Sequence, residues 1–172
     1  MEQQPLEIKQ SSLNKALAWA LSLVFFDAFL FNQGVLSAGF GLFLLFIAVP
    51  RSFLRKFKPV RSQRLRNIAI YLAAVVLVIG LNNLNNLIAH KRAELLISAI
   101  NTYHAKNHRY PQKLQDLTPE FVAKVPRAKY TLLFGEFSYF LSGENAFLFF
   151  VDFPPHGRPI YRFPDNRWGY VD

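Results

Sequence analysis

The chain has 172 residues, of which 52% are hydrophobic and 18 are phenylalanine, and its formal net charge is +9. It contains no cysteine, which excludes disulfide frameworks, zinc thiolate sites and cysteine nucleophiles. A basic chain can bind nucleic acid, but here the densest basic cluster lies between apolar runs. This placement favours a membrane protein, so we expect membrane lipids and no nucleic acid as partners.

Two apolar segments, residues 16–31 and 35–49, occupy the first part of the chain. The first approaches the ~20 helical residues that span a hydrocarbon core of ~30 Å, and the second is shorter. Only residues 32–34 separate them, which predicts a tight antiparallel helical hairpin. Small residues at helical spacing predict a seam for close helix packing: Gly34, Ala38 and Gly41.

A third apolar segment begins at Ile68 and continues to Leu81, and the sequence NNLNNLIA follows it. A span of ~20 residues must include part of this asparagine-rich stretch. Asn82, Asn83 and Asn86 are predicted to share one side of the helix. They lie either at the outer membrane interface or in a polar seam against another helix, where amide hydrogen bonds contribute ~0.6–2 kcal/mol.

Asp27 is the only acidic residue within the three apolar segments. An ionisable residue inside a membrane is a functional candidate by default, because burying its charge is costly. The alternative is that Asp27 reaches the membrane interface, since it lies about one helical turn from the end of its segment. We take Asp27 and the three asparagines as candidates for polar packing within the membrane.

Residues 51–66 hold seven Lys or Arg and no acid, between the second and third apolar segments. The positive-inside rule places this loop and the N-terminus in the cytoplasm. The predicted organisation is a tail and transmembrane hairpin, a basic cytoplasmic loop, a third transmembrane helix and an outer domain: residues 1–50, 51–67, 68–89 and 90–172.

The third helix is expected to continue beyond the membrane and to end before Pro111, which disfavours helical geometry at the residue before it. Thr118 and Pro119 suit the N-cap and first position of a second, short helix that ends at Pro126. The long helix carries an apolar stripe at 3–4 spacing: Ala93, Leu96, Ala99, Ile100 and Tyr103.

The pattern then changes from helical to alternating. Short aromatic and β-branched runs predict an antiparallel meander of three or four strands: KYTLLF (129–134), EFSYFLS (136–142), NAFLFFV (145–151) and RPIYRF (158–163). Phe137, Tyr139 and Leu141 alternate, so one sheet face is expected to pack on the long helix. The predicted fold class is an α+β membrane protein with three transmembrane helices, the third packed on this sheet.

Residues 93–126 contain a helix end, a tyrosine-proline turn, spaced leucines and a Val-Pro pair: Ala99, Ile100, Tyr103, Asn107, Arg109, Tyr110, Pro111, Leu114, Leu117, Val125 and Pro126. This pattern resembles the helix-to-loop region of type IV pilins and type II secretion pseudopilins, and the resemblance covers about residues 68–172. The resemblance implies a bacterial inner-membrane protein with a periplasmic outer domain. The pilin cleavage signature and helix-start glutamate are absent from RNIAIYLAA (66–74), which implies a pilin-like domain that stays in the membrane.

His104 and His108 are four residues apart, a spacing that places two imidazoles on one helix face. A zincin-type helix has a glutamate after the first histidine, and here that position is Ala105. A third metal ligand would have to be His90, His156 or a distant acid. We favour surface or helix-capping histidines over a metal-dependent enzyme, and no other catalytic motif occurs. The chain is therefore predicted to be no enzyme and to hold no cofactor.

The C-terminal sequence RPIYRFPDNRWGYVD is rich in residue types found at interface hot spots. The candidate partner-binding residues are Tyr161, Arg162, Arg167, Trp168 and Tyr170. Alternatively, the aromatic residues complete the sheet core and the arginines are solvated. We expect an accessory or assembly component of a type IV pilus or type II secretion system, with self-association left open. The alternative is a membrane-anchored immunity or inhibitor protein that captures a periplasmic protein.

Overall fold

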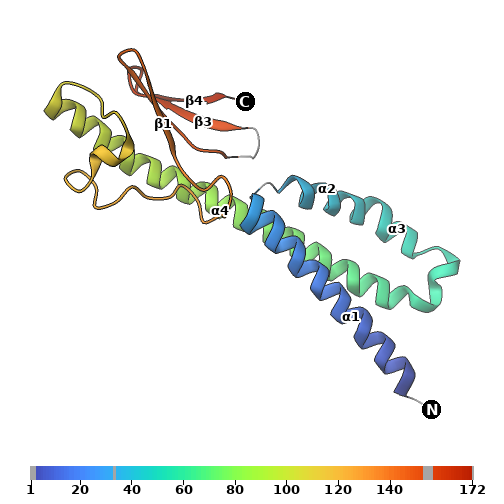
Figure 1. Ribbon diagram of the computed structural model, residues 1–172. Helices are drawn as coiled ribbons and strands as arrows, with labels where there is room; N and C mark the ends of the chain where they lie inside the picture. Colours follow the sequence, from blue (N-terminus) through green and yellow to red (C-terminus); the bar gives the residue numbers. More distant parts are fainter. Residues whose placement is uncertain (1–2, 33, 153–156, 172) are drawn as a thin grey trace. The chain divides into compact units, whose positions relative to one another are not determined.

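The computed structural model describes residues 3–32, 34–152 and 157–171. The chain divides into two compact units, Met1–Asn82 and Asn83–Asp172. One helix, α4 (Arg61–Asn107), contributes its first part to one unit and its second part to the other (Figure 1). The two units are described in turn.

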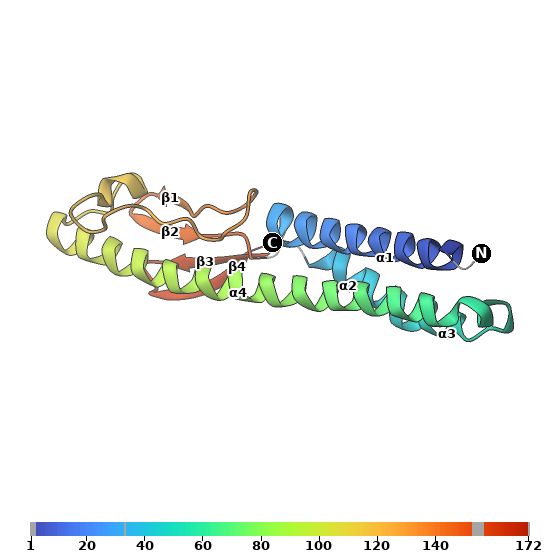
Figure 2. The same cartoon turned by 90° about the horizontal axis from the view of Figure 1, so that it is seen from below.

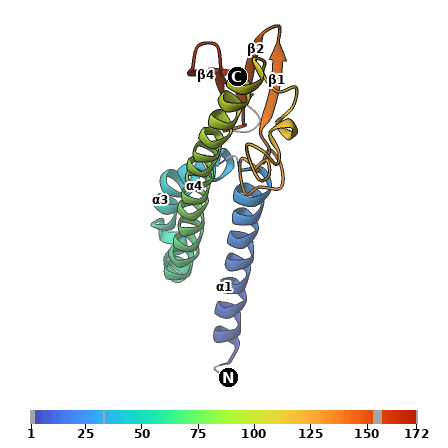
Figure 3. The same ribbon diagram turned by 90° about the vertical axis from the view of Figure 1, so that its left-hand side faces the viewer.

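The first unit is entirely helical. Helix α1 (Gln3–Val24) continues as the π-helical η1 (Phe25–Phe31), and α2 (Val35–Phe43) continues through η2 (Leu44–Ala48) into α3 (Val49–Ser52). The 3₁₀ segment η3 (Arg55–Val60) then leads into α4. Figure 3 shows α1 and α3 on opposite sides of α4. Three helices in the described residues are long and apolar enough to cross a membrane: Gln10–Phe31, Val35–Ser52 and Arg55–Asn107.

The hairpin of α1 and α2 is as tight as predicted, and small residues bring α2 close to α4. A Cβ atom added at Gly41 would lie 3.1 Å from Val75 Cγ1, and one added at Gly34 would lie 2.9 Å from Asn82 Nδ2. The predicted seam is wrong in one member, because Ala38 is exposed and Ser37 is buried instead. The seam therefore follows positions 34, 37 and 41.

Helix α4 is longer than predicted at its start. It begins at Arg61 rather than at Ile68, so the basic segment is largely helical. Arginine and glutamine are good helix formers, but a charged first turn has no apolar periodicity to reveal it. At the other end His108 has a φ of 54°, and its N–H donates to the His104 carbonyl at 2.8 Å. A left-handed residue at this position is a common helix ending.

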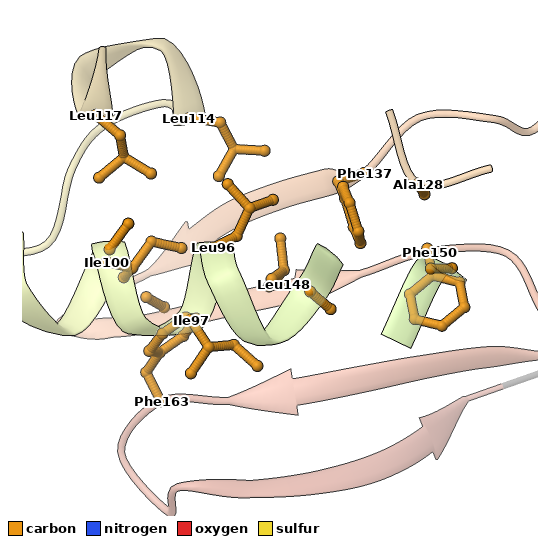
Figure 4. Packing of buried hydrophobic residues seen from close by; sticks show 14 residues of the cluster. Leu96, Ile97, Ile100, Leu114, Leu117, Ala128, Phe137, Leu148, Phe150 and Phe163 are labelled. Atoms are coloured by element: carbon orange, nitrogen blue, oxygen red, sulfur yellow. The ribbon is translucent and has the colours of Figure 1, made fainter. Parts of the chain in front are cut away.

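The second unit packs α4 against a four-stranded antiparallel meander, β1 (Ser138–Ser142), β2 (Asn145–Phe149), β3 (Arg158–Arg162) and β4 (Arg167–Val171), in sequence order (Figure 2). The predicted apolar stripe on α4 is confirmed as part of the core, with Tyr103 at its edge. Figure 4 shows this packing, in which the helix meets side chains from η4 (Leu114–Leu117), from β2 and from residues that flank the strands: Leu114, Leu117, Phe137, Leu148, Phe150 and Phe163.

Two local predictions for this unit are wrong. KYTLLF forms a loop, and the fourth strand is RWGYV, where Gly169 and the charged flanks weaken the strand pattern. No helix starts at Thr118, because its hydroxyl donates to the Gln115 carbonyl at 2.7 Å and closes the η4 turn instead of capping a new helix.

Candidate protein-binding surface

The sheet is apolar on both faces, and α4 covers one of them. In β2, Ala146 and Leu148 are buried in the core, so the alternating Phe147 and Phe149 point to the opposite face. Phe140 of β1 lies opposite Phe147 in the register, and their rings stack with centroids 4.8 Å apart. These rings form the apolar half of what we call the outer sheet face.

The basic half of the outer sheet face comes from two of the predicted partner-binding residues. Arg162 lies opposite Phe147 in the β2–β3 register and opposite Arg167 in the β3–β4 register. One cross-strand row therefore reads Phe140, Phe147, Arg162, Arg167. The Arg162 side chain lies over Gly169 of the neighbouring strand, and a Cβ atom added at Gly169 would lie 3.7 Å from Arg162 Nε. Aromatic and arginine side chains combined in this way are typical of interface hot spots.

The other predicted residues, Tyr161, Trp168 and Tyr170, alternate with these and lie on the helix side. The Tyr161 and Trp168 rings pack edge to face at 5.3 Å, and Trp168 also contacts His90 at 5.4 Å. Both rings line a groove of about 680 Å³ together with Ser98, Thr102 and other residues of α4. The structure thus splits the five predicted residues between two faces of the sheet.

The four residues proposed for polar packing within the membrane differ in their burial and contacts. Asp27 is fully buried and accepts hydrogen bonds from Gly34 N at 2.7 Å, Ser37 N at 2.9 Å and the Ser37 hydroxyl. It therefore caps the first turn of α2 from the preceding helix. Asn82 is buried beside Gly34, whereas Asn83 is exposed and Asn86 is half-buried.

The two histidines of the helix end do not converge on a metal site. The His104 ring stacks on Tyr110 at 4.2 Å, and His108 lies beyond the last turn of α4. Within the described ranges, no group of three His, Cys, Asp or Glu side chains is arranged to hold a metal ion. His156, one of the proposed third ligands, lies outside the described residues.

Sequence reasoning missed the apolar half of the outer sheet face and the role of Asn85. The unbroken run AFLFFV was a usable signal, because a strand apolar at every position is usually covered on both faces. Asn85 is buried, and its side-chain oxygen accepts a hydrogen bond from Tyr130 N at 3.3 Å. Asn85 lies three residues, or about one helical turn, after Asn82, so these two asparagines share a buried side of α4. The prediction had instead grouped Asn82 with Asn83 and Asn86.

Burial shifts the pKa of three groups in the second unit, Tyr110, Lys129 and Tyr139, and it raises that of Tyr110 above its ordinary value. Lys129 is fully buried and donates to the Asp152 carbonyl at 2.8 Å. Burial lowers the pKa of its ammonium group to about 8, and the negative charge of Asp152 opposes this shift. Burial also raises the pKa of the Tyr139 phenol above its ordinary value, and this hydroxyl donates to the Pro111 carbonyl at 2.9 Å.

Comparisons with protein-family models, with curated proteins and with solved structures find no match for this chain. Its function is therefore inferred from the residues themselves.

Proposed function

We propose that the protein is a non-enzymatic component of a bacterial inner membrane that binds another protein through its outer domain. Three helices cross the membrane, the basic segment between the second and third lies in the cytoplasm, and the outer domain lies in the periplasm. The partner belongs to a type IV pilus or a type II secretion system, and this protein acts in assembly. Helix lengths, the basic loop and the resemblance of residues 93–126 to pilins support this assignment.

The outer sheet face is the observation that carries the binding role. Phe140 is 43% exposed although its ring stacks on Phe147. The neighbouring Arg162 and Arg167 lie in the same row, and Arg167 is ion-paired with Asp165 at 3.2 Å. An apolar strip of this kind on a water-facing sheet favours a covering partner. Its chemistry fits a partner surface with apolar residues beside one or two carboxylates.

Site-specific crosslinking in the native membrane tests this proposal. A photo-crosslinking amino acid at position 140 is expected to capture a pilin-like or secretion subunit, while the same group at Leu95, an exposed position on α4, is expected to capture none. The double variant Arg162→Glu/Arg167→Glu should weaken capture at least several-fold, because it places two carboxylates against an acidic partner. Equal capture at positions 140 and 95 would contradict the proposed surface.

An immunity or inhibitor protein would use the same aromatic and basic chemistry, so this remains the second candidate. Deletion of the chain separates the two functions. Loss of piliation or secretion supports assembly, whereas sensitivity to a periplasmic toxin with normal pili supports immunity. If position 140 crosslinks to a second copy of the chain, the outer sheet face is a self-association surface and neither candidate holds.

A further inference from the structure

The loop between Lys129 and Gly135 presents apolar side chains to the solvent. Leu132 is 64% exposed, and Leu133 and Phe134 are each more than two-fifths exposed. The loop is closed by a hydrogen bond from Lys129 N to the Gly135 carbonyl at 3.1 Å. Between these two residues the sequence YTLLF contains no charge. We call residues 130–134 the apolar loop.

The apolar loop is attached to one short stretch of α4. Tyr130 N donates to the Asn85 side chain, and the Arg92 guanidinium lies over the Tyr130 ring at 4.3 Å from its centroid. Arg92 also donates to the Arg127 carbonyl at 2.9 Å. In Figure 1 the chain before β1 runs back along α4. The loop therefore lies beside residues 85–92 of the helix.

This stretch of α4 follows the apolar run that ends at Leu81. With a rise of ~1.5 Å per residue, Asn85 lies only ~6 Å beyond Leu81 along the helix axis. A span of ~20 residues that starts at Ile68 ends near Leu87. The apolar loop is thus attached where α4 would leave the hydrocarbon core.

Two carbonyl groups of the apolar loop, which lipid would penalise if they were unpaired, accept hydrogen bonds from side chains. The Thr131 carbonyl accepts a hydrogen bond from Arg127 Nη2 at 2.8 Å, and the Leu133 carbonyl accepts one from the Thr131 hydroxyl at 2.7 Å. An irregular backbone is tolerated at a membrane surface only when such groups are paired or hydrated. The side chains of Leu132, Leu133 and Phe134 can then enter the lipid without exposing these carbonyls to it.

We propose that the apolar loop is an interfacial membrane anchor that inserts Leu132, Leu133 and Phe134 into the outer leaflet of the bilayer. Lys91 and Arg92, adjacent on α4, lie at the level of the phosphate groups and favour anionic lipids. This inference rests on the proposed insertion of α4 in the membrane. It assigns a lipid surface, rather than a protein, as the partner of this loop.

Three single-cysteine variants of the otherwise cysteine-free chain test the anchor and the insertion separately. Leu132→Cys reports on the loop, and Leu95→Cys is a matched control on α4, since both leucines are 64% exposed. Leu77→Cys, at a position that is 52% exposed within the apolar run, reports on insertion. Each full-length variant is labelled with bimane and reconstituted in vesicles of phosphatidylethanolamine and phosphatidylglycerol.

Bimane fluorescence is then quenched by iodide from the water and by lipids with a spin label near the headgroup. At position 132 we expect several-fold weaker iodide quenching than at position 95, together with strong quenching by the spin-labelled lipid. Position 77 should be shielded from iodide in the same vesicles.

Three other results would overturn the anchor. If iodide reaches position 132 as readily as position 95 while position 77 is shielded, the anchor is wrong and the insertion of α4 stands. If position 77 is also open to iodide, the proposed insertion fails and the anchor fails with it. If position 132 is shielded from iodide but unaffected by the spin-labelled lipid, protein covers the loop, and the assignment to lipid is wrong.

Discussion

The two units of the molecule place their polar and apolar side chains in opposite ways. In the first unit the buried positions include alanines, serines and a carboxylate, while phenylalanines and leucines such as Phe46 and Leu21 are exposed. In the second unit the buried apolar side chains include Phe150, Phe163 and Leu148. The same chain thus follows two different rules of burial.

This difference is the one expected if the first unit lies among lipid tails, as proposed, and the second lies in water. In water, removing leucine and phenylalanine from solvent is the main source of stability. Among lipid tails this contribution is absent between helices, so close packing of small residues and hydrogen bonds take its place. Asp27 and Gly41 in the first unit and Leu148 and Lys129 in the second give four substitutions that test this contrast.

Asp27→Leu is expected to have the largest effect, because it removes the acceptor of three hydrogen bonds at the start of α2. Each buried donor that is left without a partner costs ~1–3 kcal/mol, so a loss of about 4 kcal/mol is expected. The measurement is the resistance of the detergent-solubilised protein to unfolding by sodium dodecyl sulfate. Asp27→Asn keeps one acceptor and should lose roughly half as much. An unchanged Asp27→Leu protein would refute the capping role.

Leu148→Ala should destabilise the second unit by about 3 kcal/mol, since Leu148 is fully buried and its loss leaves a cavity. Urea unfolding of the full chain, followed by Trp168 fluorescence in a Trp19→Phe background, measures this loss. Leu95→Ala is the matched control, because Leu95 is exposed on α4, and its effect should be within about 0.5 kcal/mol. Equal effects of the two variants would mean that burial of apolar side chains is not what stabilises the second unit.

Lys129 makes the stability of the second unit depend on pH. Its pKa is about 8 in the folded state and near the ordinary 10.5 in the unfolded chain, so the unfolded state binds more protons between these values. Stability should therefore rise with pH, by on the order of 2 kcal/mol from pH 8 to pH 10. Lys129→Met, which removes the ionisable group, should flatten this rise in the same urea experiment. A slope retained in the variant would assign it to another group.

Gly41→Leu is expected to give the smallest effect, about 1 kcal/mol, through overpacking of α2 against Val75. Gly39 lies on the same helix with nothing within 4 Å of an added Cβ, so Gly39→Leu controls for the change in helix propensity. Unfolding by sodium dodecyl sulfate distinguishes the pair. If Gly39→Leu is the more damaging variant, close packing along positions 34, 37 and 41 does not stabilise the first unit.

The sequence was sufficient for those parts of the fold that repeat with a fixed period. The apolar stripe of α4 and the alternation in β1 and β2 predicted the helix-on-sheet packing, because many residues carry each pattern. The loop at 129–135 could not be predicted in the same way, because distant hydrogen bonds hold it, from Lys129 Nζ to the Asp152 carbonyl and from Tyr130 N to the Asn85 side chain, and these leave no local pattern.

For the candidate protein-binding surface, the sequence predicted the types of residue but not the face of the sheet on which each residue lies. The arginine and aromatic residues of 158–172 were identified by type, but their division between two faces depends on strand register. The strand register is also needed to place Phe147 and Phe149 on the outer sheet face. A run of apolar residues has the same sequence pattern whether a helix or a partner covers its second face. The role of Asn85 could not be predicted without knowing that the loop containing Tyr130 returns to α4.

The order of the strands has a consequence for how the second unit is made. Each strand pairs with the one synthesised just before it, and α4 precedes them all. Such local connectivity lets folding advance along the chain as it emerges, without long loop closures that slow nucleation. We expect amides of β1 and β2 to gain protection before those of β4 during refolding, which pulsed hydrogen exchange would detect. Simultaneous protection of all four strands would instead indicate that the sheet forms in one concerted step on α4.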